Sequence, residues 1–246
     1  MSLSYESEIE PQELDVDPDE TASVRPDLPY YTIVLVSSIA AVALVQFGTG
    51  LDASIVSAGF DKPAFLRDHE YWRILTGATT HGSIMHVFMN CYAFYSFGKI
   101  FEMLSNRAHL ALAFVLAALG GGVMSLIFVP GGVSVGASGG IVGLIGYLAV
   151  YAFRRRQFIS AEFRKSLLIN IGFILVFGLV LYQVIDNFGH IGGLITGAVY
   201  GFVQIPTDEH VDPRKAGSSV EIAGIAAVGA YVAACCFSIL LILHLV

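Results

Sequence analysis

The feature that most limits the fold of this chain is a set of seven long apolar runs separated by short polar segments. A helix needs about 20 apolar residues to cross the hydrocarbon core of a membrane, and each run reaches or approaches that length. Charged residues make up 13% of the sequence, whereas soluble chains contain about 25%. The sequence therefore predicts an all-α, polytopic membrane protein. The expected spans are Tyr31–Phe47, Ser83–Leu104, His109–Val129, Ser138–Phe153, Leu167–Gln183, Gly189–Gln204 and Ile222–Val246.

Basic residues fall unevenly on the two sides of these spans. If the N-terminus is cytoplasmic, the outer segments contain only Lys62, Arg67 and Arg73, and the inner segments contain the others. Because Lys and Arg are retained on the cytoplasmic side, this orientation is favoured and the C-terminus is expected to be extracytoplasmic. The basic residues of the inner loops are Lys99, Arg107, Arg154, Arg155, Arg156, Arg164, Lys165, Arg214 and Lys215.

The first 29 residues differ from the rest because they contain nine acidic residues in an aliphatic-poor stretch. Such a composition predicts a disordered acidic cytoplasmic tail, and it lacks the basic and apolar regions of a signal peptide. We expect a six-helix core over residues 30–204, a cytoplasmic loop at 205–221 and an additional transmembrane helix at 222–246. Nothing in the charge pattern indicates nucleic-acid binding.

The segment between the first two spans, from Gly48 to about Gly82, is too long to be a simple connector. Loops of this length are usually functional or partly structured. Its run Glu70-Tyr71-Trp72-Arg73 contains the only tryptophan of the chain, which suits a segment in the membrane interface. Both a functional role and simple anchoring are compatible with this run.

Three predicted spans begin with polar residues that also have a structural interpretation. His86 and Asn90 share one face of a helix, Ser138 lies in a Gly-Ala-Ser-Gly-Gly run, and His190 precedes glycines spaced by four. Each of these groups can serve helix packing, because small residues and interhelical hydrogen bonds are common in membranes. No His-Glu-x-x-His run is present, and the three cysteines lack metal-type spacing, so we expect neither a metal site nor a cofactor.

The predicted topology places all four of these polar residues at a similar depth in the outer leaflet. A serine hydroxyl becomes a useful nucleophile when a histidine removes its proton. An asparagine amide, a histidine N–H and a backbone N–H can stabilise the oxyanion that then develops. The shared depth and the complementary chemistry of these four residues therefore indicate that they form one site, and not four unrelated packing contacts.

Four short motifs in this order resemble those of the rhomboid intramembrane serine proteases. The resemblance extends from Trp72 to about Gly197, roughly half of the chain, and the joint match is far more specific than any single motif. It implies a rhomboid-like six-helix core with an additional C-terminal transmembrane helix. The matching motifs are Trp72-Arg73, His86-x-x-x-Asn90, Gly136-x-Ser138-Gly139 and His190-x-x-Gly193-x-x-x-Gly197.

The resemblance also implies roles for individual residues. Ser138 and His190 would form the catalytic dyad, while His86, Asn90 and the Ser138 amide would stabilise the oxyanion. The substrates would be single-span membrane proteins cut near the outer leaflet. The residues expected to support the site are His81, Trp72, Arg73, Gly136, Gly139, Gly193 and Gly197.

Two positions complicate this interpretation. Many family members have an aromatic residue four positions after the serine, whereas this chain has Val142, so the orientation of the catalytic histidine must depend on other contacts. Asp186 lies four residues before His190, but a helix-capping aspartate is a more common arrangement than a third catalytic residue.

We therefore expect a serine endopeptidase of the cell membrane that uses a Ser–His dyad and no cofactor. One alternative is a catalytically silent rhomboid-like protein that binds membrane clients, although such relatives normally lack the serine or the histidine. Another is a transporter, for which an internal repeat would be expected. The sequence does not identify the natural substrate or the oligomeric state.

Overall fold

The computed structural model describes residues 28–208 and 210–246, so most of the predicted acidic tail lies outside the described residues. Within the described part, the chain forms ten helices and one antiparallel pair of two-residue strands. The long helices are α1 (Tyr30–Thr49), α5 (Ile84–Leu104), α6 (Arg107–Phe128), α7 (Ser138–Arg154), α8 (Ala161–Val180), α9 (Asn187–Gln204) and α10 (Ser218–Ile242). The short elements are α2 (Leu51–Ala58), β1 (Phe60–Asp61), α3 (Lys62–Arg67), α4 (Arg73–Thr76) and β2 (Val133–Ser134).

Each of the seven predicted spans corresponds to one long helix, but the boundaries of two of them were wrong. Helix α8 begins at Ala161, six residues before the predicted start at Leu167. The Ser160 hydroxyl accepts a hydrogen bond from Phe163 N at 3.2 Å, and this cap starts the helix within polar sequence that hydropathy does not detect. Helix α10 begins at Ser218 and ends at Ile242, so it is displaced toward the N-terminus relative to the prediction.

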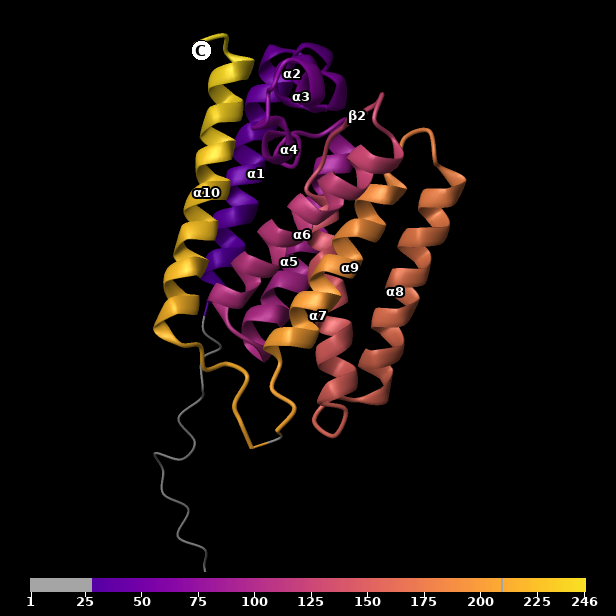
Figure 1. Cartoon of the computed structure of the whole chain (residues 1–246), viewed down its shortest axis with the longest axis vertical. Coiled ribbons are helices and arrows are strands. Elements are labelled where there is room, and N and C mark those ends of the chain that lie inside the picture. Colours follow the sequence, from indigo (N-terminus) through magenta and orange to yellow (C-terminus); the bar gives the residue numbers. More distant parts are fainter. Residues whose placement is uncertain (1–27, 209) are drawn as a thin grey trace, which may run out of the picture.

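Helices α6, α7 and α9 occupy the middle of the bundle. Helices α1 and α10 lie side by side along one flank, whereas α8 lies on the opposite flank (Figure 1). Helix α7 is the most deeply packed, and its buried side chains include Leu144, Ile145, Tyr147 and Leu148. The central position of α7 places its first residue, Ser138, between neighbouring helices.

Four helices of the described part are long and apolar enough to cross a membrane, namely α1, α6, α8 and α10. Helix α7 is apolar but has only 17 residues. Helices α5, α7 and α9 carry the polar residues of the candidate site. The architecture is that of a polytopic membrane protein whose shortest apolar helix is at its centre.

The long segment between α1 and α5 is structured, as its length predicted. It folds into α2, β1, α3 and α4 and covers one end of the bundle, called here the site end (Figure 1). Strand β1 pairs with β2, so that Phe60 lies opposite Ser134 and Asp61 opposite Val133. This pairing joins the segment to the loop that leads into α7.

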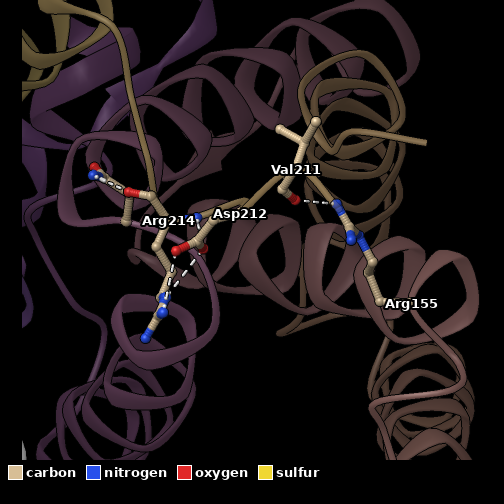
Figure 2. Close-up of polar contacts among 5 residues, drawn as sticks. Arg155, Val211, Asp212 and Arg214 are labelled. Carbon is tan, nitrogen blue, oxygen red and sulfur yellow. Dashed lines mark hydrogen bonds and ion pairs between the residues drawn. The ribbon is translucent and has the colours of Figure 1, made fainter. Parts of the chain in front are cut away.

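At the opposite end, the basic residues after α7 hold the loop between α9 and α10. Arg155 donates a hydrogen bond to the carbonyl oxygen of Val211 at 2.7 Å, and Arg214 pairs with Asp212 at 3.1 Å (Figure 2). Arg154 donates to the carbonyl oxygen of Phe202 near the end of α9 at 2.7 Å. The charged run therefore ties the end of α7 to the end of α9 and to the loop that follows it.

Candidate active site

Ser138 is the first residue of α7 and follows a sharply turned backbone. Gly136 has a φ of 119°, a conformation that side-chain-bearing residues rarely adopt. Its N–H donates to the carbonyl oxygen of Gly77 at 2.9 Å, which attaches the turn to the segment after α4. The local sequence thus places the Ser138 hydroxyl at the site end of a buried helix.

His190 lies in the first turns of α9 and faces Ser138. The distance between His190 Nε2 and Ser138 Oγ is 2.8 Å, which is a normal hydrogen bond. The histidine is only 9% exposed, and its Nδ1 atom has no hydrogen-bond partner among the described residues. The structure therefore brings the two predicted dyad residues together, 52 positions apart in sequence.

The close approach of α7 and α9 depends on glycines. A Cβ atom on Gly193 would overlap the carbonyl oxygen of Gly139, and one on Gly197 would overlap that of Gly143. The predicted stripe of small residues is therefore a backbone-to-backbone contact between these helices. Because Gly193 and Gly197 follow His190 on α9, this contact sets the distance at which His190 meets Ser138.

His86, from the first turn of α5, lies beside the turn that precedes Ser138. A Cβ on Gly136 would lie 2.8 Å from His86 Nε2. The amide of Gly82 donates to His86 Nδ1 at 3.4 Å, so Nδ1 acts as an acceptor and Nε2 carries the ring proton. This tautomer directs a hydrogen-bond donor toward the Gly136–Ser138 turn.

Asn90 lies one turn further along α5 and is buried. Its amide nitrogen donates to the carbonyl oxygen of His86 at 2.9 Å, while its Oδ1 atom has no partner among the described residues. Buried polar atoms without partners are rare and need an explanation, such as a functional role. Asn90 thus lies on the same helix as His86, one turn further along, as predicted. One of its amide hydrogens is bonded to the backbone of that helix, and the other is not.

His81 supports His86 from the loop before α5. The two rings lie 5.0 Å apart and nearly perpendicular to one another. Burial, together with the neighbouring His86 ring, lowers the pKa of His81 to about 3, so this ring is neutral at physiological pH. The Gln46 side chain of α1 accepts a hydrogen bond from the His81 backbone amide at 3.0 Å and so fixes the loop.

Trp72 and Arg73 hold the covering segment, and in the described part of the chain no hydrogen bond or ring contact joins them to the dyad. Arg73 pairs with Glu70 and donates to the carbonyl oxygen of Gly59 at 2.9 Å. The Trp72 ring packs edge-on against Phe237 of α10, with centroids 5.9 Å apart. The Trp72-Arg73 motif therefore stabilises the covering segment and packs it against α10.

The structure gives Asp186 the capping role and not that of a third catalytic residue. Its carboxylate accepts hydrogen bonds from Gly189 N at 2.8 Å and from the hydroxyls of Ser125 and Ser134. Among the described residues, no hydrogen bond links this carboxylate to His190. Val142, which replaces the expected aromatic residue, is buried in α7.

A small cavity lies next to the dyad. It has a volume of about 50 Å³, and its lining includes Phe60, Ile74, Val135, Ser138, Asp186 and His190. One water molecule needs roughly 10–15 Å³ of such space, so the cavity can hold a few. The arrangement can therefore activate a hydroxyl nucleophile, stabilise an oxyanion beside it and supply water. No cluster of three metal-ligating side chains occurs among the described residues.

Helix α10, which the sequence predicted only as an additional transmembrane helix, contacts the segment that holds the turn before Ser138. The Tyr231 hydroxyl donates to the carbonyl oxygen of Ala78 at 2.9 Å, and Ser238 bonds to Thr79 at 2.8 Å. Both side chains are fully buried. Because the adjacent Gly77 carbonyl holds the turn at Gly136, α10 is connected to the nucleophile through two hydrogen bonds and a short stretch of backbone.

Replacing Tyr231 by phenylalanine is expected to lower the free energy of unfolding by about 1–3 kcal/mol, because a buried carbonyl oxygen loses its donor. The measurement is thermal unfolding in detergent. Tyr182→Phe makes the same substitution at an exposed tyrosine and is the matched control. It should change the unfolding temperature little. Equal unfolding temperatures for the two variants would show that α10 does not stabilise this segment.

Three residues near the site could not be recognised from the sequence. Lys62 was noted only as one of the basic residues in the outer segments, and Ser125 and Ser134 were not singled out. All three join a hydrogen-bonded cluster around the Asp186 carboxylate. A single lysine in a loop carries no pattern that distinguishes a buried side chain from a solvated one.

Comparison with known proteins identifies the family. Residues 68–207, more than half of the chain, match the rhomboid domain. The chain is 31% identical over 145 residues to RHOMBOID-like protein 6, mitochondrial, from Arabidopsis thaliana, covering 58% of this chain and 47% of the relative. It is 30% identical over 173 residues to the rhomboid protease GluP of Bacillus subtilis, covering 70% and 34% respectively.

The relatives include proteins named as proteases and others named as inactive. Inactive rhomboid protein 1 from Papio anubis is 28% identical over 139 residues, covering 56% of this chain and 16% of the relative. The matches to the Arabidopsis protein and to GluP span less than half of the length of each. The multi-pass helical architecture, the Ser138–His190 contact and the matched domain lead to one conclusion: the chain belongs to the rhomboid family of membrane proteins.

Proposed function

We propose that the protein is an intramembrane serine endopeptidase with Ser138 as nucleophile and His190 as general base. The observation that carries this proposal is the 2.8 Å hydrogen bond between His190 Nε2 and Ser138 Oγ in a buried site beside a cavity. A nucleophile and base within this distance are the signature of covalent catalysis by serine. The rhomboid protease named among its relatives supports the same class of reaction.

The reaction follows from these positions. Ser138 Oγ attacks the scissile carbonyl carbon and forms a carbon–oxygen bond while its proton passes to His190 Nε2. The resulting oxyanion accepts hydrogen bonds from the Ser138 amide and the His86 Nε2–H, and from the second amide hydrogen of Asn90. His190 then gives the proton to the leaving amine as the carbon–nitrogen bond breaks. Water hydrolyses the acyl-enzyme by the same steps.

The expected substrates are transmembrane segments of single-span membrane proteins, cut near the outer leaflet of the cell membrane. In the proposed orientation the N-terminus is cytoplasmic, and the C-terminus and the site end are extracytoplasmic. The basic residues at the end opposite the site support this orientation through the positive-inside rule. We further propose that residues 30–204 form the catalytic core, that 222–246 form an added helix and that no cofactor takes part.

The direct test is cleavage of a single-span membrane substrate by the purified protein in liposomes. The unmodified protein should cleave it and Ser138→Ala should not, because the nucleophile is lost. Ser166→Ala, at an exposed position on α8, is the matched control and should cleave normally. Cleavage that persists in Ser138→Ala would exclude the proposed mechanism.

Two other functions remain as alternatives. Some relatives are named as inactive, so a client-binding role without hydrolysis is the main competitor. The complete dyad in hydrogen-bond contact argues against it, because binding a client does not require an activated serine. A transporter would need a solute path with access from both sides in turn, and the polar groups of the candidate site gather at one end only.

Replacing His86 by alanine is expected to lower kcat about a hundred- to a thousandfold, because one donor to the oxyanion is lost. The KM should change little, since the oxyanion exists only after attack. Steady-state kinetics with the liposome substrate measures both constants. A rise in KM at unchanged kcat would instead place His86 in ground-state binding.

A further inference from the structure

A group of buried polar side chains lies beside the dyad and takes no part in the proposed reaction steps. It consists of Lys62 of α3, Ser125 of α6, Ser134 of β2 and Asp186 before α9, here called the Lys62 cluster. Lys62 Nζ donates to Ser134 Oγ at 2.9 Å, and the Ser134 hydroxyl donates to Asp186 Oδ2. Four separate elements therefore meet at one carboxylate.

The charges of the Lys62 cluster are withdrawn from solvent. Lys62 is only 1% exposed, and burial lowers its pKa while the Asp186 carboxylate partly offsets that effect. Burial tends to raise the pKa of Asp186, but hydrogen bonds from Ser125, Ser134 and Gly189, together with Lys62, bring it below the usual value. Asp186 is therefore ionised at neutral pH.

Stability alone does not account for two opposite buried charges that are linked through the Ser134 hydroxyl. Replacing a buried ion pair by well-packed apolar residues is often neutral or stabilising, because desolvation opposes the attraction between the charges. The cluster does, however, join the covering segment, the loop before α7 and the start of α9. All three parts of the chain border the cavity beside the nucleophile.

The cluster has a direct geometric relation to both dyad residues. Ser134 lies four residues before Ser138, and Asp186 lies four residues before His190. The Asp186 carboxylate caps α9 through Gly189 N, and the Asp186 carbonyl accepts a hydrogen bond from His190 N at 3.1 Å. Fixing Ser134 against Asp186 therefore fixes the two backbones that carry Ser138 and His190.

We propose that Lys62, Ser134 and Asp186 form an ionic cluster that positions His190 against Ser138 and keeps a negative charge near the imidazole. The inference rests on the proposed function. The titratable groups around the pair are Lys62 from α3, His86 from α5, and Asp186 and His190 from the start of α9. When His190 takes the Ser138 proton, the Asp186 charge stabilises the imidazolium by Coulomb attraction, without a direct hydrogen bond. Lys62 and Asp186 are thus positioning residues.

The test compares Lys62→Met, Asp186→Asn and the double variant with the unmodified protein. Methionine keeps the length of the Lys62 stem without its charge, and asparagine is as good a helix cap as aspartate. Lys165→Met, at an exposed lysine of α8, is the matched control. The measurements are kcat and KM in liposomes, the unfolding temperature, and amide hydrogen exchange over residues 131–138 and 184–190.

Each single variant is expected to lower kcat about ten- to a hundredfold at nearly unchanged KM. The reason is that a small displacement of His190 relative to Ser138 weakens proton transfer between them. Lys62→Met should also speed amide exchange in both measured segments. The double variant should regain unfolding temperature relative to the single variants, since neither charge is then left alone, while its kcat stays low. This separation of stability from rate would distinguish positioning from simple structural support.

The proposal is overturned if kcat in Lys62→Met equals that in Lys165→Met, or if kcat returns together with the unfolding temperature in the double variant. If Lys62→Met does not fold, the double variant still decides between these outcomes. If the unmodified protein cleaves nothing, the proposed function fails, and hydrogen exchange tests the cluster independently. Unchanged exchange at residues 184–190 in Lys62→Met would then contradict the positioning role.

Discussion

Substitution of His190 by asparagine is expected to lower kcat for substrate cleavage by at least about a thousandfold, or about 4 kcal/mol of barrier. The reason is that Ser138 Oγ has His190 Nε2 as its hydrogen-bonded base at 2.8 Å. Without this base the hydroxyl keeps its proton and remains a weak nucleophile. The kinetics are measured in liposomes with a single-span membrane substrate.

The fold should survive this substitution, so that the loss of rate can be assigned to chemistry. Circular dichroism and thermal unfolding in detergent would report the fold of His190→Asn. His210→Asn, at an exposed histidine in the loop between α9 and α10, is the matched control and should retain full activity. A His190→Asn variant that is folded and cleaves within about tenfold of the unmodified rate would remove His190 from the mechanism.

The second large effect is expected from Gly197→Val, which should prevent α7 and α9 from packing. A Cβ at this position would overlap the carbonyl oxygen of Gly143, and backbone atoms within a helix cannot move aside as a side chain can. Overpacking alone costs about 1–3 kcal/mol where side chains can adjust, so the loss here should be larger. Unfolding in detergent with increasing denaturant measures the change.

Gly172→Ala provides the control for this substitution. A Cβ at Gly172 would have nothing within 4 Å, so alanine there should be neutral or raise stability slightly through its helix propensity. If Gly197→Val unfolds at the same denaturant concentration as Gly172→Ala, the contact between the glycine stripe of α9 and α7 does not hold the site together.

The sequence predicted the parts of this molecule that depend on simple periodic or compositional rules. Long uncharged runs are expected to be helices in a membrane, since backbone groups there need internal hydrogen bonds. Each predicted span corresponds to one long helix of the described residues, although the boundaries of α8 and α10 differ from the prediction. The meeting of Ser138 with His190 was expected because both lie near the same end of the bundle. The spacing of Gly193 and Gly197 likewise indicated a close helix contact.

Other features depend on tertiary contacts that no local pattern records. The start of α8 was missed because its first turn is polar and is fixed by the Ser160 cap. The burial of Lys62 follows from the pairing of β1 with β2, two strands of two residues each that are too short to give a sequence signal. The hydrogen bonds of α10 to the Ala78–Thr79 segment arise between residues more than 150 positions apart.

The measurement that most directly tests the central claim is labelling of the detergent-purified protein with a fluorophosphonate, followed by mass mapping of the modified residue. An activated serine reacts with such a probe, whereas an ordinary hydroxyl does not. Labelling is predicted at Ser138 and should vanish in both Ser138→Ala and His190→Asn. Folded protein that is not labelled, or labelling of Ser138 that continues unchanged in His190→Asn, would contradict an active Ser138–His190 dyad and favour the client-binding alternative.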